Sequence, residues 1–313
     1  MDLNFTPYKA GEEQRILDLF SHVFGWELPL AFWRWRQLEN PAGGPWTEMV
    51  WDGDNLAGHY AVAAAKLCVH GEPVRACLSM TTMVHQNYRG QGIFERSAES
   101  IYERLTAAGI KAVYGFPNNN SHRPFIQKVG WQDIYEIPTL ALNVADARKR
   151  ESRSVVEVET FDERFDRLWQ RIKNRHAVWG WRDSESLSWR FTRNPINKYR
   201  VAILTDGGEI KGYVVTKRYL DQGIDIVDLV AEDNGAVAEL IAWATGEADK
   251  LKLPRVNMWA PIDSEARKRI EVAGFVPVAP VTYLGGRVFA EDLGVDFFDR
   301  RLWHYSMSDS DFY

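Results

Sequence analysis

A short turn with one arginine and two glycines stands between two predicted elements and could bind a phosphate group. Residues 76–83 form an apolar, strand-like run, and a helix is predicted to begin at Gly92. Main-chain amides in the first helical turn have no partner within the helix, and the helix dipole adds partial positive charge there. Arg89 adds a full charge, and Gly90 lets an anion approach the main chain. The spacing therefore predicts an anion site at residues 89–94.

Two common phosphate-binding loops do not fit this turn. A P-loop would end in Gly-Lys-Ser/Thr, which is absent, and a dinucleotide fingerprint would need a third small residue where Glu95 stands. The remaining pattern, Arg89-x-x-Gly92-x-Phe94, resembles motif A of the GNAT N-acyltransferase superfamily. Phe94 departs from the usual Gly or Ala of that motif and is similar to subgroups that have Gly-Ile-Phe at this point.

This resemblance implies acetyl-CoA or another acyl-CoA as co-substrate, with its pyrophosphate held by the main-chain amides of the turn. It also implies that a main-chain amide near Val84 polarises the thioester carbonyl, which makes Val84 a catalytic position. Asn118 stands where family members often place an Asn against the cofactor. The implied cofactor-binding residues are Met83, Val84, Arg89, Gly90, Gln91, Gly92, Ile93, Phe94 and Asn118.

The acid and base of the family have no clear counterpart in this chain. Many members have a Tyr four residues before the Gly of a Gly-Phe/Trp pair, but here that position is Ile126, ahead of Gly130. Many also have a Glu on the strand before the turn, whereas residues 74–84 contain no carboxylate. Our hypothesis is that Tyr60 or His122 assists proton transfer. The alternative for each is a purely structural role.

A pattern in the first half recurs in the second half, which indicates a duplication. Trp35-Arg36-x-x-x-Asn40-Pro41 returns as Trp189-Arg190-x-x-x-Asn194-Pro195, at an offset of 154 residues (189 − 35). Phe116-Pro117 matches Ala260-Pro261 at an offset of 144 (261 − 117). The second copy lacks the Arg-x-x-Gly turn, so we expect an acyl-CoA-binding domain at 1–148 and a degenerate copy at 154–313. Residues 146–153 between them are charged and polar, as linkers are.

Residues that the two copies share are predicted to be structural, and residues found only in the first copy are better candidates for chemistry. Trp33 and Arg34, which correspond to Leu187 and Ser188, are predicted to line the acceptor groove. Tyr60 corresponds to Val214 in the same comparison.

The predicted fold is α/β, with two tandem GNAT-like domains, each a mixed, mostly antiparallel sheet flanked by helices. In the first copy the unit from Met80 to Phe116 is expected to be a strand–helix–strand crossover with parallel strands. The predicted strands of this copy are 3–7, 47–51, 58–69, 74–84, 112–116 and 137–144, and the predicted helices are 12–24, 29–37, 92–108 and 119–129.

Composition excludes several other classes of function. A formal charge of −5 and a pI of about 5.9 give no electrostatic basis for binding nucleic acid. The two cysteines make no disulfide framework, and the seven scattered histidines show no metal-ligand spacing. We find no signal peptide or membrane span, so the expectation is a cytoplasmic protein, either a monomer or a weak homodimer.

The last residues leave two interpretations open. Residues 302–313 begin like a strand and end with acidic side chains. They are either a solvated terminus or a segment that returns into the cleft between the two halves and supplies a carboxylate to the acceptor amine.

The predicted function is acyl-CoA-dependent N-acyl transfer, most simply N-acetyl transfer, by direct attack of an amine on the thioester. The acceptor is predicted to be a primary amine of a small molecule, such as an amino sugar or sugar nucleotide. One alternative is acyl or aminoacyl transfer to peptide or cell-wall amines. Another is a non-catalytic acyl-CoA sensor, which would bind acetyl-CoA without turning over any amine.

Overall fold

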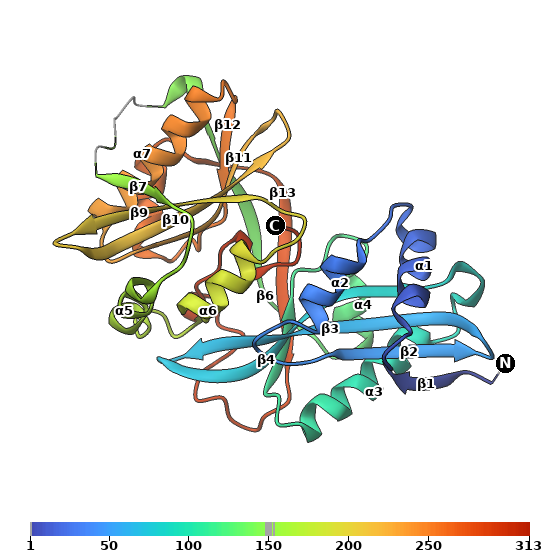
Figure 1. Cartoon of the computed structure of the whole chain (residues 1–313). Helices are drawn as coiled ribbons and strands as arrows, with labels where there is room; N and C mark the ends of the chain where they lie inside the picture. Colours follow the sequence, from blue (N-terminus) through green and yellow to red (C-terminus); the bar gives the residue numbers. More distant parts are fainter. Residues whose placement is uncertain (1, 148–151, 153) are drawn as a thin grey trace. The chain divides into compact units, whose positions relative to one another are not determined.

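The computed structural model describes residues 2–147, 152 and 154–313, and the chain divides into two compact units (Figure 1). Unit 1 holds the residues up to Leu67 together with Val74–Ile134 and Tyr283–Phe298. Unit 2 holds the described residues of Cys68–Pro73, Tyr135–Thr282 and Asp299–Tyr313. The chain therefore enters each unit more than once.

Unit 1 is a sheet in the order β1-β2-β3-β4-β5-β13, with helices on both faces (Figure 1). The β1–β2 and β2–β3 pairs are antiparallel and the β4–β5 pair is parallel, as predicted for the crossover through α3. The strands are β1 (Asn4–Pro7), β2 (Trp46–Asp52), β3 (Asn55–Val69), β4 (Glu72–Val84), β5 (Ala112–Gly115) and the second half of β13 (Val276–Val288). The helices are α1 (Glu13–Phe24), α2 (Leu30–Gln37), α3 (Ile93–Ala107) and α4 (His122–Lys128), with a 3-10 turn η1 (Gln86–Tyr88).

Alternation along the strands assigns the two faces of this sheet. Met49 packs with residues of α1 and α2, whereas its neighbour Val50 packs against Ile93 at the start of α3. Gly58 lies where α3 comes close to the sheet, because a Cβ at Gly58 would stand 2.6 Å from the Ile93 side chain. This close approach explains why a glycine is needed at position 58.

Unit 2 contains mixed, hydrogen-bonded strands in the order β6-β12-β11-β10-β9-β7 (Figure 1). Its core lies between the strands and α7. Gly212 lies at another close approach, since a Cβ added there would stand 2.7 Å from the Val230 carbonyl oxygen. The strands are β6 (Gln132–Asn143), β7 (Val155–Val158), β8 (Val178–Gly180), β9 (Tyr199–Asp206), β10 (Glu209–Tyr219), β11 (Gly223–Ala231), β12 (Arg255–Met258) and the first half of β13. The helices are α5 (Glu163–Ile172), α6 (Ser184–Leu187), α7 (Asn234–Lys250) and α8 (Glu265–Val272), with short turns η2 (Val144–Asp146), η3 (Ser188–Thr192), η4 (Arg300–Leu302) and η5 (Met307–Asp309).

The two copies repeat one order of elements, which agrees with the duplication read from the sequence. Each copy has a strand, two helices, three strands joined in sequence, a long helix, a short parallel strand, a short helix and a last strand, with β8 as an addition in the second copy. The predicted fold class, a mixed and mostly antiparallel sheet in each copy, is confirmed.

The last strands of the two copies are exchanged. The end of β13, which closes the second copy in sequence, pairs with β5 in unit 1 through Gly285 and Gly115. The last strand of the first copy, β6, pairs with β12 in unit 2 through Leu142 and Val256. The sequence predicted two consecutive domains, 1–148 and 154–313, and the linker residues 148–151 and 153 lie outside the described residues. The compact units differ from that division because each unit takes its final strand from the other copy.

Candidate functional site

The predicted anion-binding turn connects β4 to α3 in unit 1. Gly90 and Gly92 have φ values of +79° and +69°, a left-handed conformation that favours glycine. A Cβ at either glycine would face open space, so the main chain here is accessible. Gly92 is the N-cap of α3 and offers no side chain to the first helical amides. In the described part of the chain, the amides of Gly90, Gln91 and Gly92 donate no hydrogen bond to the protein.

The charges at this turn favour an anion. Arg89 is exposed, and its guanidinium makes no hydrogen bond or ion pair with any described residue. Glu95 in the first turn of α3 would oppose an anion, but Lys128 binds its carboxylate at 2.5 Å. This hydrogen bond lowers the pKa of Glu95, which keeps the carboxylate ionised and its charge neutralised by Lys128.

The corresponding helix of unit 2 begins differently. The N-cap of α7 is Asp233, whose carboxylate accepts a hydrogen bond of 2.8 Å from the amide of Ala236. A carboxylate of the protein therefore already occupies the helix N-terminus, where an anionic ligand would have to bind. Glu232 beside it adds a second acidic group, bound to Arg171 at 2.5 Å. The contrast supports an anion site at α3 and none at α7.

In the part of the chain that the structure describes, one edge of β4 loses its neighbouring strand before the turn. The parallel pairing with β5 joins Ala76–Leu78 to Ala112–Tyr114, and β5 ends at Gly115 while β4 continues to Val84. The amide of His85 donates to the Ala57 oxygen of β3 at 3.0 Å. Because successive amides of a strand point to opposite edges, the amide of Val84 points away from β3, toward the side where β5 has ended.

Tyr60, predicted as a proton-transfer group, lies in the core instead. Its hydroxyl is fully buried and hydrogen-bonds to Ser79 and Tyr102, both at 2.9 Å. Trp131 donates to the same Tyr102 hydroxyl at 2.8 Å. Burial raises the pKa of Tyr60 well above its usual value. A buried hydroxyl with two protein partners cannot exchange protons with a substrate amine, so the structure disagrees with the predicted role of Tyr60.

His122 is the more accessible of the two predicted proton-transfer groups. It begins α4, and its Nε2 lies 2.7 Å from Asp133 Oδ1. Its ring stacks on Tyr283 with centroids 3.8 Å apart. The Nδ1 atom has no hydrogen-bond partner among the described residues. A carboxylate therefore orients this imidazole from one side and leaves the other nitrogen available.

Asn118 follows β5 and shapes the turn that leads to α4. Its Oδ1 accepts hydrogen bonds from the amides of Asn120 at 2.9 Å and Ser121 at 3.1 Å. Its own main-chain oxygen accepts from the His122 amide at 2.8 Å. Asn118 is exposed, so the predicted contact with a cofactor would have to use its side-chain Nδ2.

The two predicted acceptor-groove residues have different environments. Trp33 is buried in the core beneath α1 and α2, with its ring 5.0 Å from that of Tyr8. The prediction that Trp33 lines a groove is therefore wrong, because its side chain fills the core. Arg34, the next residue, is exposed on α2.

A pair of histidines that the sequence analysis missed lies at the end of β4. His22 of α1 stacks on His85 with ring centroids 4.2 Å apart and planes 7° from parallel. His85 Nδ1 accepts from the Asn87 amide at 3.3 Å and so caps η1. Burial, His22 and Arg89 lower the pKa of His85. The position of His85 directly after Val84 was a signal in the sequence, but His22 is distant in sequence and gave none.

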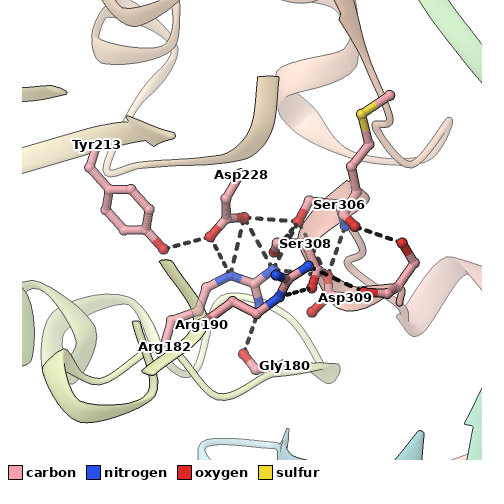
Figure 2. A network of polar contacts seen from close by, with 10 residues as sticks. Gly180, Arg182, Arg190, Tyr213, Asp228, Ser306, Ser308 and Asp309 are labelled. Carbon is pink, nitrogen blue, oxygen red and sulfur yellow. Dashed lines mark hydrogen bonds and ion pairs between the residues drawn. The ribbon is translucent and has the colours of Figure 1, made fainter. Parts of the chain in front are cut away.

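The tail of the chain is not solvated but fixed within unit 2 by a buried polar network (Figure 2). Arg182 binds Asp228 at 3.1 Å and Asp309 at 2.9 Å. Ser306 donates to Asp228 at 2.9 Å. Arg190 donates to the main-chain oxygens of Ser308, Ser310 and Tyr313. The expectation of a solvated terminus therefore needs correction. Asp309 is paired with Arg182, and the main-chain oxygen of Tyr313 accepts a hydrogen bond from Arg190. That the tail supplies a carboxylate to the acceptor amine stays a prediction.

The two cysteines are packed thiols and form no disulfide. Cys68 and Cys77 are both buried and free, and burial raises the pKa of each. Among the described residues no group of three or more His, Cys, Asp or Glu side chains could hold a metal ion. None of the helices in that part of the chain has the length and apolar character needed to cross a membrane.

Comparisons with known proteins agree with the predicted fold. Residues 4–134 match the family model of the acetyltransferase (GNAT) domain, the family that the sequence resembles. A comparison with curated proteins gave no match.

Solved structures similar to this chain extend the likeness over both copies. One is a probable N-acyltransferase from Enterococcus faecalis V583, with a TM-score of 0.73 and 14% identity over 92% of this chain and 73% of that one. A GCN5-related N-acetyltransferase from Kribbella flavida has a TM-score of 0.71 and 17% identity over 92% and 71% of the two chains. N-myristoyltransferase of Saccharomyces cerevisiae, solved with myristoyl-CoA, has a TM-score of 0.64 and 12% identity over 91% and 79%. At these identities the likeness shows a shared fold.

Proposed function

We propose that this protein transfers the acyl group of one acyl-CoA, bound in unit 1, to a primary amine of a small molecule such as an amino sugar or sugar nucleotide. The observation that carries the proposal is the turn between β4 and α3. It combines accessible glycine amides, an N-cap without a side-chain bond and an unpaired Arg89. The N-myristoyltransferase that shares the fold is described with bound myristoyl-CoA, which supports an acyl-CoA ligand here.

In this proposal the pyrophosphate binds the amides of residues 90–94 and the side chain of Arg89. The pantetheine arm runs along the edge of β4 that is free beyond Leu78. The amide of Val84 points to that edge and donates to the thioester carbonyl, so that negative charge developing on this oxygen is stabilised. Unit 2 binds no acyl-CoA, since Asp233 caps α7 in place of a phosphate.

The proton that the attacking amine loses has to go to a base near the end of β4. His122 is our candidate, because Asp133 orients the ring and stabilises the imidazolium while Nδ1 is free to exchange a proton. Tyr60 is no longer a candidate, since it is buried and saturated by internal hydrogen bonds.

The proposal is tested first by calorimetric titration with acetyl-CoA, longer acyl-CoA species and NAD. We expect micromolar binding of acyl-CoA at one site per chain, no binding of NAD, and loss of binding in the Arg89→Ala/Gly92→Trp double variant. Release of CoA is then measured with a panel of amino sugars, sugar nucleotides, polyamines and peptides. Absence of acyl-CoA binding would refute the proposal, and binding without turnover of any amine would indicate a sensor.

The role of His122 is tested in the same assay once an amine is turned over. His122→Ala should lower kcat by about 10²-fold or more, the usual contribution of general acid–base catalysis. Asp133→Asn should lower kcat less, because the imidazole is then only less well oriented. Full activity of His122→Ala would show that another group accepts the proton.

A further inference from the structure

Thr81 interrupts β4 with an unusual main-chain conformation. Its φ is +48°, a left-handed value that a β-branched residue rarely adopts. Among the described residues the other non-glycine residues with positive φ are His70, Leu220 and Lys252, which lie in hairpin turns or just after a helix. Thr81 alone in this group stands inside a strand. Such strain persists only where the surroundings hold it, and it is most often found at functional sites.

The group that holds Thr81 is the imidazole of His59 on β3. His59 is 1% exposed, and its Nδ1 donates a hydrogen bond of 2.9 Å to the main-chain oxygen of Thr81. Burial lowers the pKa of His59 to about 4, so the ring is neutral at pH 7 and its single proton lies on Nδ1. The other nitrogen, Nε2, is buried and has no partner in the described part of the chain. Among the described residues, the hydrogen bond of this ring is therefore the one to the main-chain oxygen of Thr81 in β4.

Unit 2 has a comparable contact at the equivalent place. The two copies can be aligned by their parallel strand pairs, in which Cys77 pairs with Val113 beside α3 and Ile224 pairs with Val256 beside α7. Four residues after Cys77 is Thr81 in β4, and four residues after Ile224 is Asp228 in β11. The β10–β11 pairing also shifts register here, beside Asp228.

The ring that reaches this second irregularity is Tyr213, which corresponds to His59 at the 154-residue offset (213 − 59). Its hydroxyl donates to the Asp228 carboxylate at 2.8 Å (Figure 2). In unit 2 the ring thus meets a side chain that Arg182 also holds, whereas in unit 1 it meets the main chain itself.

We propose that His59 is a positioning residue of the acyl-transfer site, which holds the irregularity at Thr81 so that the amide of Val84 faces the thioester carbonyl. An extra or twisted residue in a strand changes which edge each later amide faces. Thr81 lies three residues before Val84, and the amide of His85 then returns to regular pairing with Ala57. The inference rests on the proposed function, because it names the residue that aligns the donor of that same site.

The test uses the full chain with acetyl-CoA labelled with carbon-13 at the carbonyl, whose infrared stretch reports hydrogen bonding directly and needs no acceptor. In wild type the stretch should shift to lower wavenumber on binding. His59→Leu keeps the bulk of the ring but removes the donor, and it should lose most of this shift. His59→Asn keeps an N–H donor at the position of Nδ1 and should retain the shift.

Two further variants separate positioning from general stability. His59→Leu/Thr81→Gly should regain the shift, because glycine adopts a φ of about +50° without strain and needs no restraint. Tyr213→Phe removes the equivalent bond in unit 2 and should lower the unfolding midpoint without changing the shift. In turnover, His59→Leu should lower kcat on the order of 10²-fold with little change in KM for acetyl-CoA, and His59→Asn should restore it.

The outcomes distinguish this inference from the proposed function. If wild type binds acetyl-CoA and shows the shift, but His59→Leu keeps it, His59 has no positioning role. The same conclusion follows if His59→Asn loses the shift as fully as His59→Leu does. If wild type binds no acetyl-CoA at all, the proposed function itself fails, and the inference fails with it.

Discussion

Substitution of Arg182 by Met should destabilise unit 2 strongly. Arg182 is 4% exposed and binds two carboxylates, those of Asp228, which is 1% exposed, and Asp309, which is 11% exposed. Methionine fills a similar volume but leaves both acids with only neutral partners, including Tyr213 and Ser306 for Asp228. Breaking a buried pair from one side costs about 3–5 kcal/mol of unfolding free energy, because the remaining charge is uncompensated.

The measurement is thermal and urea unfolding followed by circular dichroism. For a unit of 150–250 residues, a loss of about 3–5 kcal/mol lowers the midpoint by roughly 6–20 °C. The control is Arg218→Met in the same unit, whose ion pair with Asp221 has side chains 54% and 92% exposed. Removal of such an exposed pair should cost less than about 1 kcal/mol.

A third variant tests the reason for the loss. Arg182→Met/Asp228→Asn/Asp309→Asn removes the cation and both anions together, so it should be more stable than Arg182→Met alone. A loss below about 1 kcal/mol in Arg182→Met would refute the view that this network is dry and charge-paired. A triple variant no more stable than the single one would show that volume, not charge, determines the effect.

Three further predictions concern other parts of the structure. Gly92→Val should weaken acetyl-CoA binding at least about tenfold, because a β-branched residue disfavours a left-handed φ by about 1–2 kcal/mol and its side chain blocks the amides. The control is Gly207→Val, at a similar φ of +58°, which should bind acetyl-CoA normally. The pKa of His59 falls from 6.5 to about 4 on folding, so this group contributes stability at pH 7 that is lost below about pH 6.5, by about 2 kcal/mol at pH 5. Burial also lowers the pKa of His176 and of His304, so the test is a comparison between two proteins. Wild type should lose about 2 kcal/mol more than His59→Asn between pH 7 and pH 5, and equal losses in the two proteins would contradict the prediction. Cys68 and Cys77 should not react with a thiol reagent until the chain is unfolded, and fast reaction of the native protein would show that these side chains are more accessible than described.

The apolar pattern of the sequence predicted the helix and strand beside the site, with boundaries that differ from the structure by one or two residues. The helix expected at 92–108 is α3, Ile93–Ala107, and the strand expected at 74–84 is β4, Glu72–Val84. These elements follow from apolar periodicity and from glycines at the turn, both of which act between neighbours in the sequence. The parallel β4–β5 pair was predictable for the same reason, since a strand–helix–strand unit has few topologies.

Features set by distant contacts were predicted less well. Tyr60 was chosen because the second copy lacks it, yet its alternation with Val62 on the α3 face of β3 indicates a core position. The short parallel strands β5 and β12 correspond when Val113 is aligned with Val256, because both valines are buried against a helix. This alignment gives an offset of 143 residues (256 − 113), one less than the 144 read from the sequence pattern. The burial of the tail depends on Arg182 and Arg190, which lie more than a hundred residues before their partners in the tail, Asp309 and Ser308.

The exchange of β6 and β13 has a consequence for the order in which the protein acquires its structure during synthesis. Unit 1 needs Tyr283–Phe298, which the ribosome adds about 160 residues after Ile134. At about 5–20 residues per second, roughly 10–30 s pass in which β5 has no partner on its outer edge. An unpaired strand edge is a template for pairing with other chains, so the newborn first copy depends on protection until its last strand arrives. For the same reason, a gene divided at the linker should yield halves that fold only when they are produced together.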